Sequence, residues 1–313
     1  IFIAAPFMIC SFIMNNLLRF QGKASFAMVG ITVGGLLNIA LDPLFIFTLD
    51  MGTAGAALAT GLSQFISFCI LLWMCNHQDS CISISIRKFR PKLAIYREVL
   101  YGGIPSLGRQ GIASVATILM NFMCQPYGDA AIAAMSIVSR FMFFINSVII
   151  GFGQGFQPVC SYCFGAGLYD RVKKACWFCI RVSTIILLVL SVISFPAARS
   201  IITLFRRNDP TVIEIGTLAL RLQLITLPLQ GAVIMGNMMP QSIGYGFRAT
   251  LVSTARQGIF LIPLLTIMTY TIGLLGIQCA QPLADIATFI LSLFVIRGIF
   301  KEFPEDASSF AAQ

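Results

Sequence analysis

The sequence has little charge and few of the residues that build enzyme active sites. Only 11% of its 313 residues are charged, whereas a soluble domain contains roughly 25%. His77 is the single histidine, and no HExxH, GxSxG or Walker-type loop occurs. The chain is therefore expected not to be an enzyme and to need no cofactor. An integral membrane enzyme that uses isolated Asp or Cys residues stays open as a distant alternative.

Hydrophobic residues are abundant, at 58% of the chain with a mean hydropathy of +0.88. An apolar stretch of about 20 residues crosses the hydrocarbon layer as one helix. The sequence therefore predicts an all-α polytopic membrane protein. Its nine apolar stretches are residues 1–19, 25–48, 53–75, 98–124, 130–158, 175–197, 211–238, 248–271 and 274–298.

The net charge of +9 is explained by membrane topology rather than by a nucleic-acid partner, because the basic residues lie in the connections between apolar stretches. Lys and Arg gather after the first, third and fifth apolar stretches, and residues 76–97 form the longest basic connection. Connections 49–52, 125–129 and 272–273 have neither residue. The basic side is cytoplasmic, so we expect a multi-pass protein of the plasma membrane with a cytoplasmic C-terminus. Arg206 falls on the opposite side and is an exception to the pattern.

An internal repeat relates two parts of the chain by a shift of 221 positions. Repeated units are the usual construction of secondary transporters. Because an even number of apolar stretches separates the copies, both run through the membrane in the same direction. The matched pairs are Asn16 with Asn237, Gly52 with Gly273, Gly55 with Gly276, and Gln64 with Asp285.

The repeat and the long basic connection predict two lobes. Three apolar stretches precede the connection and six follow it, so nine of an expected twelve transmembrane helices are present. The expected divisions are a first-lobe remainder at 1–76, an inter-lobe cytoplasmic loop at 77–97, a second lobe at 98–300 and a polar tail at 301–313.

Three segments are similar to the multidrug and toxic compound extrusion family. They read NNLLRFQGKASFAMVGITVGGLLNIALDPLFIF, MGTAGAALATGLSQ and FGQGFQPVCSYCFGAG. The resemblance implies a two-lobe helical bundle that exports small organic, cationic or amphipathic compounds in exchange for H⁺ or Na⁺. It implies a monomer, surrounded by membrane lipid, that works by alternating access. A flippase for a lipid-linked saccharide, from the wider superfamily, is the alternative.

Asp42 is the most informative single residue, because an acid inside an apolar stretch is costly unless it is used. Asn38 precedes it by one helical turn, so the two side chains share a helix face. The resemblance implies that Asn15 and Thr60 join them around one cation site for coupling. The alternative is that Asp42 lies near the outer end of its helix and caps a turn before Pro43.

Polar residues of the fifth apolar stretch predict a polar side of the second-lobe substrate cavity. These residues are Arg140, Asn146, Gln154 and Gln157. An Arg-containing cavity suits an anionic or lipid-linked solute, which keeps the flippase alternative open.

Pro105 and Pro158 interrupt long apolar stretches beside glycines, and they are candidate hinges. Two CxxC pairs, at Cys160 and Cys163 and at Cys176 and Cys179, have a spacing known from zinc sites. Cysteine is also a common small apolar residue of helices, so we predict no metal site there.

Overall fold

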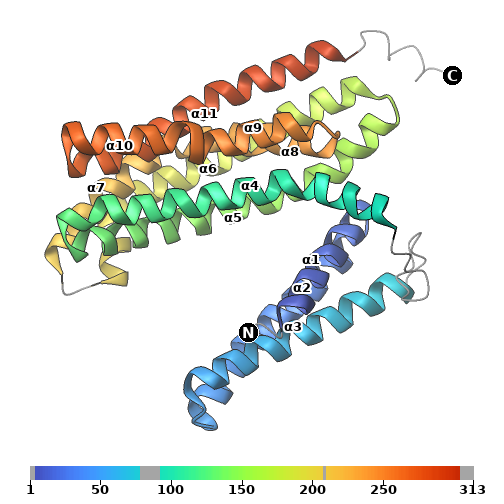
Figure 1. Cartoon of the computed structure of the whole chain (residues 1–313), viewed down its shortest axis with the longest axis horizontal. Helices are drawn as coiled ribbons and strands as arrows, with labels where there is room; N and C mark the ends of the chain where they lie inside the picture. The colour runs from blue at the N-terminus through green and yellow to red at the C-terminus, as the bar shows by residue number, and fades with distance from the viewer. Residues whose placement is uncertain (1–3, 78–91, 207–208, 304–313) are drawn as a thin grey trace. The chain divides into compact units, whose positions relative to one another are not determined.

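The computed structural model describes residues 4–77, 92–206 and 209–303, without the side chains of residues 98–99, 101–106 and 108–109. This part of the chain is helical, as Figure 1 shows. The chain divides into two compact units, residues 1–92 and residues 93–313.

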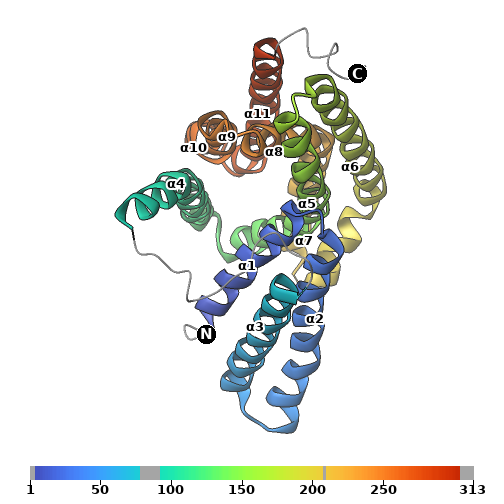
Figure 2. The same ribbon diagram turned by 90° about the vertical axis from the view of Figure 1, so that its right-hand side faces the viewer.

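The first unit is a group of three helices joined by short turns. α2 and α3 pack closely (Figure 2) because Gly30 and Gly34 of α2 lie against Leu71 and Ser67 of α3. Its elements are α1 (Ala5–Phe20), α2 (Ala24–Pro43), the π-helix η1 (Leu44–Thr48) and α3 (Gly52–His77).

The second unit is a larger bundle with one continuous hydrophobic core. Long helices α5 and α6 pack on each other and on α7 and α8, and α11 packs on α7, α8 and α10. Its elements are α4 (Leu93–Cys124), η3 (Gln125–Tyr127), α5 (Asp129–Gly165), α6 (Tyr169–Phe205), α7 (Pro210–Thr226), η4 (Leu227–Leu229), α8 (Gln230–Ser242), α9 (Gly246–Thr254), η5 (Ala255–Phe260), α10 (Leu261–Ile272) and α11 (Leu274–Glu302).

Each of the nine predicted stretches coincides with a helical segment over the residues that the structure describes. Seven segments among the described residues are long and apolar enough to cross a membrane, and α1 is a shorter apolar helix. Large apolar side chains point outward from both units, for example Leu36, Phe144 and Ile193. A surface of this kind fits a lipid environment, so the prediction of an all-α multi-pass membrane protein is confirmed.

Two turns have the same construction in the two units, as the repeat predicts. Gly52 and Gly273 both have positive φ values, +53° and +71°. Three residues later, a Cβ on Gly55 or on Gly276 would lie less than 3.0 Å from the carbonyl group of Phe45 or Met268. Only glycine allows the two helices to approach so closely at each turn.

Two π-helical stretches interrupt membrane-crossing helices. η1 directly follows Pro43 at the end of α2, and η5 lies in the middle of the segment Gly246–Ile272. On either side of η5 the packing partner changes, since α9 packs mainly on α8 and α10 mainly on α11. Such stretches are often found at functional sites.

Candidate functional site

Asn38 and Asp42 form a polar pair inside the apolar helix α2. The Asn38 Nδ2 donates a hydrogen bond of 3.3 Å to Asp42 Oδ1, as their spacing of one helical turn predicts. Both side chains are half-buried. Asp42 has no ion-pair partner among the described residues, so a cation can approach its carboxylate.

Thr60 lies at the level of this pair, on the neighbouring helix. α2 and α3 run antiparallel, with Gly34 against Ser67 and Phe45 against Gly55. These two contacts set residues 34–45 beside residues 67–55 of the antiparallel neighbour. Residues 38 and 42 lie near the middle of the first segment and residue 60 near the middle of the second, so the three positions share one level. The Thr60 Oγ1 donates to Ala56 O at 2.9 Å, and its lone pairs are still able to bind a cation.

The structure does not bring Asn15 to this pair. Its Nδ2 donates to Ala27 O at 2.7 Å, and its Oδ1 accepts from Arg19 Nε at 2.7 Å. Ala27 precedes Asp42 by fifteen residues, which is about 22 Å along a helix. Asn15 is 2% exposed and ties α1 to α2. Of the four expected residues, the structure thus brings Asn38 and Asp42 into contact, places Thr60 at the same level of α3, and leaves Asn15 elsewhere.

The predicted cavity residues of the second unit lie along α5 and do not form one cluster. Residues 140 and 157 are about 26 Å apart along the helix. Gln157 Nε2 donates to Gln241 Oε1 on α8 at 3.3 Å. Asn146 Oδ1 is buried with no hydrogen-bond partner among the described residues, Gln154 is half-buried, and Arg140 is exposed.

The candidate hinges have different settings. α5 continues as a helix through Pro158. Gly153 lies against Met235 and Met238 of α8, so it serves close packing there, whereas Gly155 has no atom of another element within 4 Å of its Cβ position. Pro105 is within α4, but its side chain lies outside the described residues.

The paired cysteines lie in the packed interface of α5 and α6. Cys160, Cys176 and Cys179 are buried and Cys163 is half-buried. In the described part of the chain, no group of three or more His, Cys, Asp or Glu side chains is arranged to hold a metal ion.

Sequence reasoning missed a second charged site, centred on Asp285 of α11. Its side chain is 1% exposed and forms an ion pair of 2.8 Å with Arg256 Nε in η5. Gln230 Nε2 of α8 donates to Asp285 at 2.8 Å, and Gln281 Nε2 donates at 3.2 Å. Two signals were available: an acid inside an apolar stretch, and the repeat, which pairs Asp285 with Gln64 and Gln281 with Thr60.

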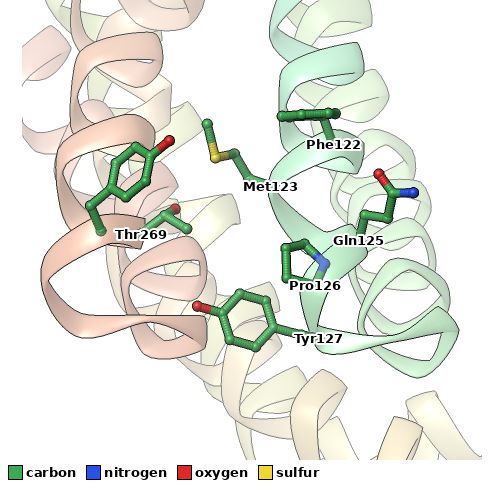
Figure 3. Close-up of a pocket in the computed structure, with 7 residues that line it drawn as sticks. Phe122, Met123, Gln125, Pro126, Tyr127 and Thr269 are labelled. Atoms are coloured by element: carbon green, nitrogen blue, oxygen red, sulfur yellow. The ribbon is translucent and has the colours of Figure 1, made fainter.

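A cavity of about 400 Å³ lies where α4 turns into α5, beside the end of α10. Figure 3 shows Met123 and Tyr127 reaching toward α10. No charged side chain lines it, so it adds nothing to either ion site. Its lining residues are Phe122, Met123, Gln125, Pro126, Tyr127, Thr269 and Tyr270.

Comparison with known families decides the assignment of the chain. The MatE family model matches residues 105–275, more than half of the sequence. The chain belongs to the MatE family. The resemblance read from the sequence motifs is thereby confirmed.

Relatives of this MatE chain include named export proteins. It is 28% identical to the multidrug export protein MepA of Staphylococcus haemolyticus over 98% of its own length and 68% of that protein's. It is 28% identical to MepA of Staphylococcus aureus strain MRSA252, over 94% of this chain and 65% of that protein. The chain thus spans about two thirds of these relatives. Their names are those of transporters, in agreement with the expectation of no enzyme.

Solved structures of the family have the same fold. An outward-facing multidrug resistance MATE family transporter of the MOP superfamily is 26% identical with a TM-score of 0.85, and the match covers 94% of this chain and 66% of that one. A MATE crystal structure in complex with MaL6 is 24% identical, with a TM-score of 0.88 over 95% of this chain and 67% of that one, and is similar in fold.

Proposed function

We propose that this MatE protein exports small organic compounds, cationic or amphipathic, in exchange for Na⁺ or H⁺. The observation that supports exchange most directly is the Asn38–Asp42 pair, a carboxylate without a countercharge inside a membrane-crossing helix. The relatives named as multidrug export proteins support the substrate class.

The chemistry of the pair suits both cations. Carboxylate, amide and hydroxyl oxygens of Asp42, Asn38 and Thr60 are hard ligands for Na⁺, and the carboxylate alone can accept a proton. Burying a charged carboxylate in a closed lobe is costly, and a bound cation removes much of that cost. Cation binding and solute binding then favour different conformations of the transporter, which couples the two flows.

The remaining features follow from the same proposal. The protein acts as a monomer surrounded by lipid in the plasma membrane, with a cytoplasmic C-terminus. The polar side of α5, from Arg140 to Gln157, contacts the solute on its path.

The test is efflux of a fluorescent cationic dye from liposomes that hold the complete protein, under an imposed Na⁺ or H⁺ gradient. Asp42→Asn keeps the size of the side chain and removes its charge, so we expect gradient-driven efflux to fall at least tenfold. Asp50→Asn, on the exposed turn after η1, is the matched control and retains wild-type efflux. Unchanged coupling in folded Asp42→Asn protein would refute the proposed cation site.

A further inference from the structure

The ion pair in the second unit uses only one edge of its arginine. Arg256 Nε contacts Asp285, while the two terminal nitrogens of Arg256 have no hydrogen-bond partner among the described residues. The Arg256 side chain is 24% exposed and that of Asp285 only 1%. The free edge of the guanidinium therefore points away from the buried acid.

Asp285 holds that guanidinium in a fixed orientation. The carboxylate accepts from Arg256, Gln230 and Gln281 on three different elements. An arginine fixed at one edge presents the other edge without further ordering, and two parallel N–H groups match the two oxygens of a carboxylate. A lysine at this position would keep the positive charge but would lack the two parallel N–H groups.

Gln230 shows independently that the cluster is not saturated. Its Oε1 is buried with no hydrogen-bond partner among the described residues. The amide is unable to turn over, because its oxygen would then face the carboxylate of Asp285. The cluster thus has one unused acceptor at Gln230 and one unused double donor at Arg256, and unused polar groups inside a membrane helix bundle are rare.

We propose that Arg256 binds a carboxylate on the exported solute, which makes it a specificity-determining residue of the second unit. Asp285, Gln230 and Gln281 are positioning residues for the Arg256 guanidinium. The inference rests on the proposed export function and names one chemical group that its substrates have.

Two dyes that differ in one group make the test specific. Rhodamine 6G is an ethyl ester and a cation, and its hydrolysed form has a free carboxylate on the same ring system. Efflux of both is measured from liposomes with the complete protein, as wild type and Arg256→Lys. We expect Arg256→Lys to reduce efflux of the acid dye at least tenfold more than efflux of the ester dye.

Two further variants separate recognition from folding. In the double variant Arg256→Gln with Asp285→Asn, neutral hydrogen-bonding groups replace both charges, and the same loss specific to the acid dye is expected. Arg248→Lys, in the exposed pair with Glu302, is a control that leaves the ratio of the two dyes at the wild-type value. Equal losses for both dyes in the Arg256 variants would show that Arg256 only stabilises the fold.

Dye binding to the detergent-solubilised protein, followed by fluorescence anisotropy, distinguishes this inference from the export function. If Arg256→Lys binds the acid dye more weakly but the wild type exports neither dye, the carboxylate site is supported and the export function is refuted. Efflux of the ester dye in the wild type, with no efflux or binding of the acid dye, would retain export and reject the carboxylate site.

Discussion

The two units each place an acid inside a membrane-crossing helix, in opposite surroundings. Asp42 is half-buried and has one hydrogen bond of 3.3 Å, from Asn38. Asp285 is 1% exposed and has an arginine and two glutamines. The internal repeat does not relate the two acids, since Asp285 corresponds to Gln64 of α3 and Asp42 corresponds to Pro263. Each unit thus places its acid on a different helix of the repeated pair.

The difference separates an acid that has no countercharge among the described residues from one that an arginine already neutralises. A carboxylate without a countercharge gains most from a bound cation, so cation binding at Asp42 changes the energy of the whole lobe. The charge of Asp285 is already balanced by Arg256, so a cation gains little there. This contrast is the reason for proposing cation coupling in the first unit and recognition of a charged group of the solute in the second.

The largest effect on stability is expected for Asp285→Asn. Removing one partner of a buried ion pair leaves the other uncompensated, which costs about 3–5 kcal/mol. Thermal unfolding in detergent measures the loss, and the double variant with Arg256→Gln should recover most of it. A double variant as unstable as the single one would contradict the ion-pair explanation.

A smaller effect, equal in the two units, is expected at the repeated glycines. Gly55→Ala and Gly276→Ala each force a Cβ against a backbone carbonyl, at about 1–3 kcal/mol. Gly35→Ala in α2, where no atom of another element lies within 4 Å of the Cβ position, is the control and should be neutral or stabilising. Different losses at Gly55 and Gly276 would show that the turns are not equivalent.

Asp42→Asn should change stability in detergent by less than about 1 kcal/mol, because it weakens one long hydrogen bond and removes a charge that is only half-buried and has no ion-pair partner among the described residues. The proposed function predicts that the same variant loses gradient-driven efflux, so transport should fall while the melting temperature stays near the wild-type value. If Asp42→Asn lowered the melting temperature as much as Asp285→Asn does, Asp42 would have a structural role too. The proposed contrast between a transport acid in the first unit and a structural acid in the second would then be wrong.

The smallest effect is expected for Glu302→Gln. Its pair with Arg248 lies at the surface, with side chains 44% and 33% exposed, and such pairs are screened by water. Thermal unfolding should show no measurable change. A clear loss would mean that exposure does not decide the strength of the two ion pairs in this unit.

The sequence alone allowed the helices to be predicted, because a chain in lipid satisfies its backbone only by forming helices or closed barrels. Apolar length then locates each span, and Asn38 and Asp42 follow from helical spacing. The repeat pairs Gly52 with Gly273, and glycine is the residue that most readily adopts the positive φ of a tight turn, so both turns could be located from the sequence.

The remaining site residues depend on contacts between distant segments. Asn15 has the residue type that the family motif requires, but its amide bonds to Ala27 and its carbonyl to Arg19. The spacing of residue types along a sequence does not predict which hydrogen-bond partner a side chain finds on another helix or turn. The ring of donors around Asp285 likewise comes from α8, η5 and α11, which only tertiary packing brings together.

The π-helix η5 also has a mechanical consequence. Buried residues Ala249, Val252 and Ala255 recur every three positions up to the first residue of η5, and the next ones, Leu261 and Leu265, follow only after a gap of six. The helix therefore turns a different side to its neighbours beyond η5, and one membrane crossing has its two halves attached to different partners. Arg256 lies at the junction of the two halves, where its ion pair with Asp285 fastens η5 to α11.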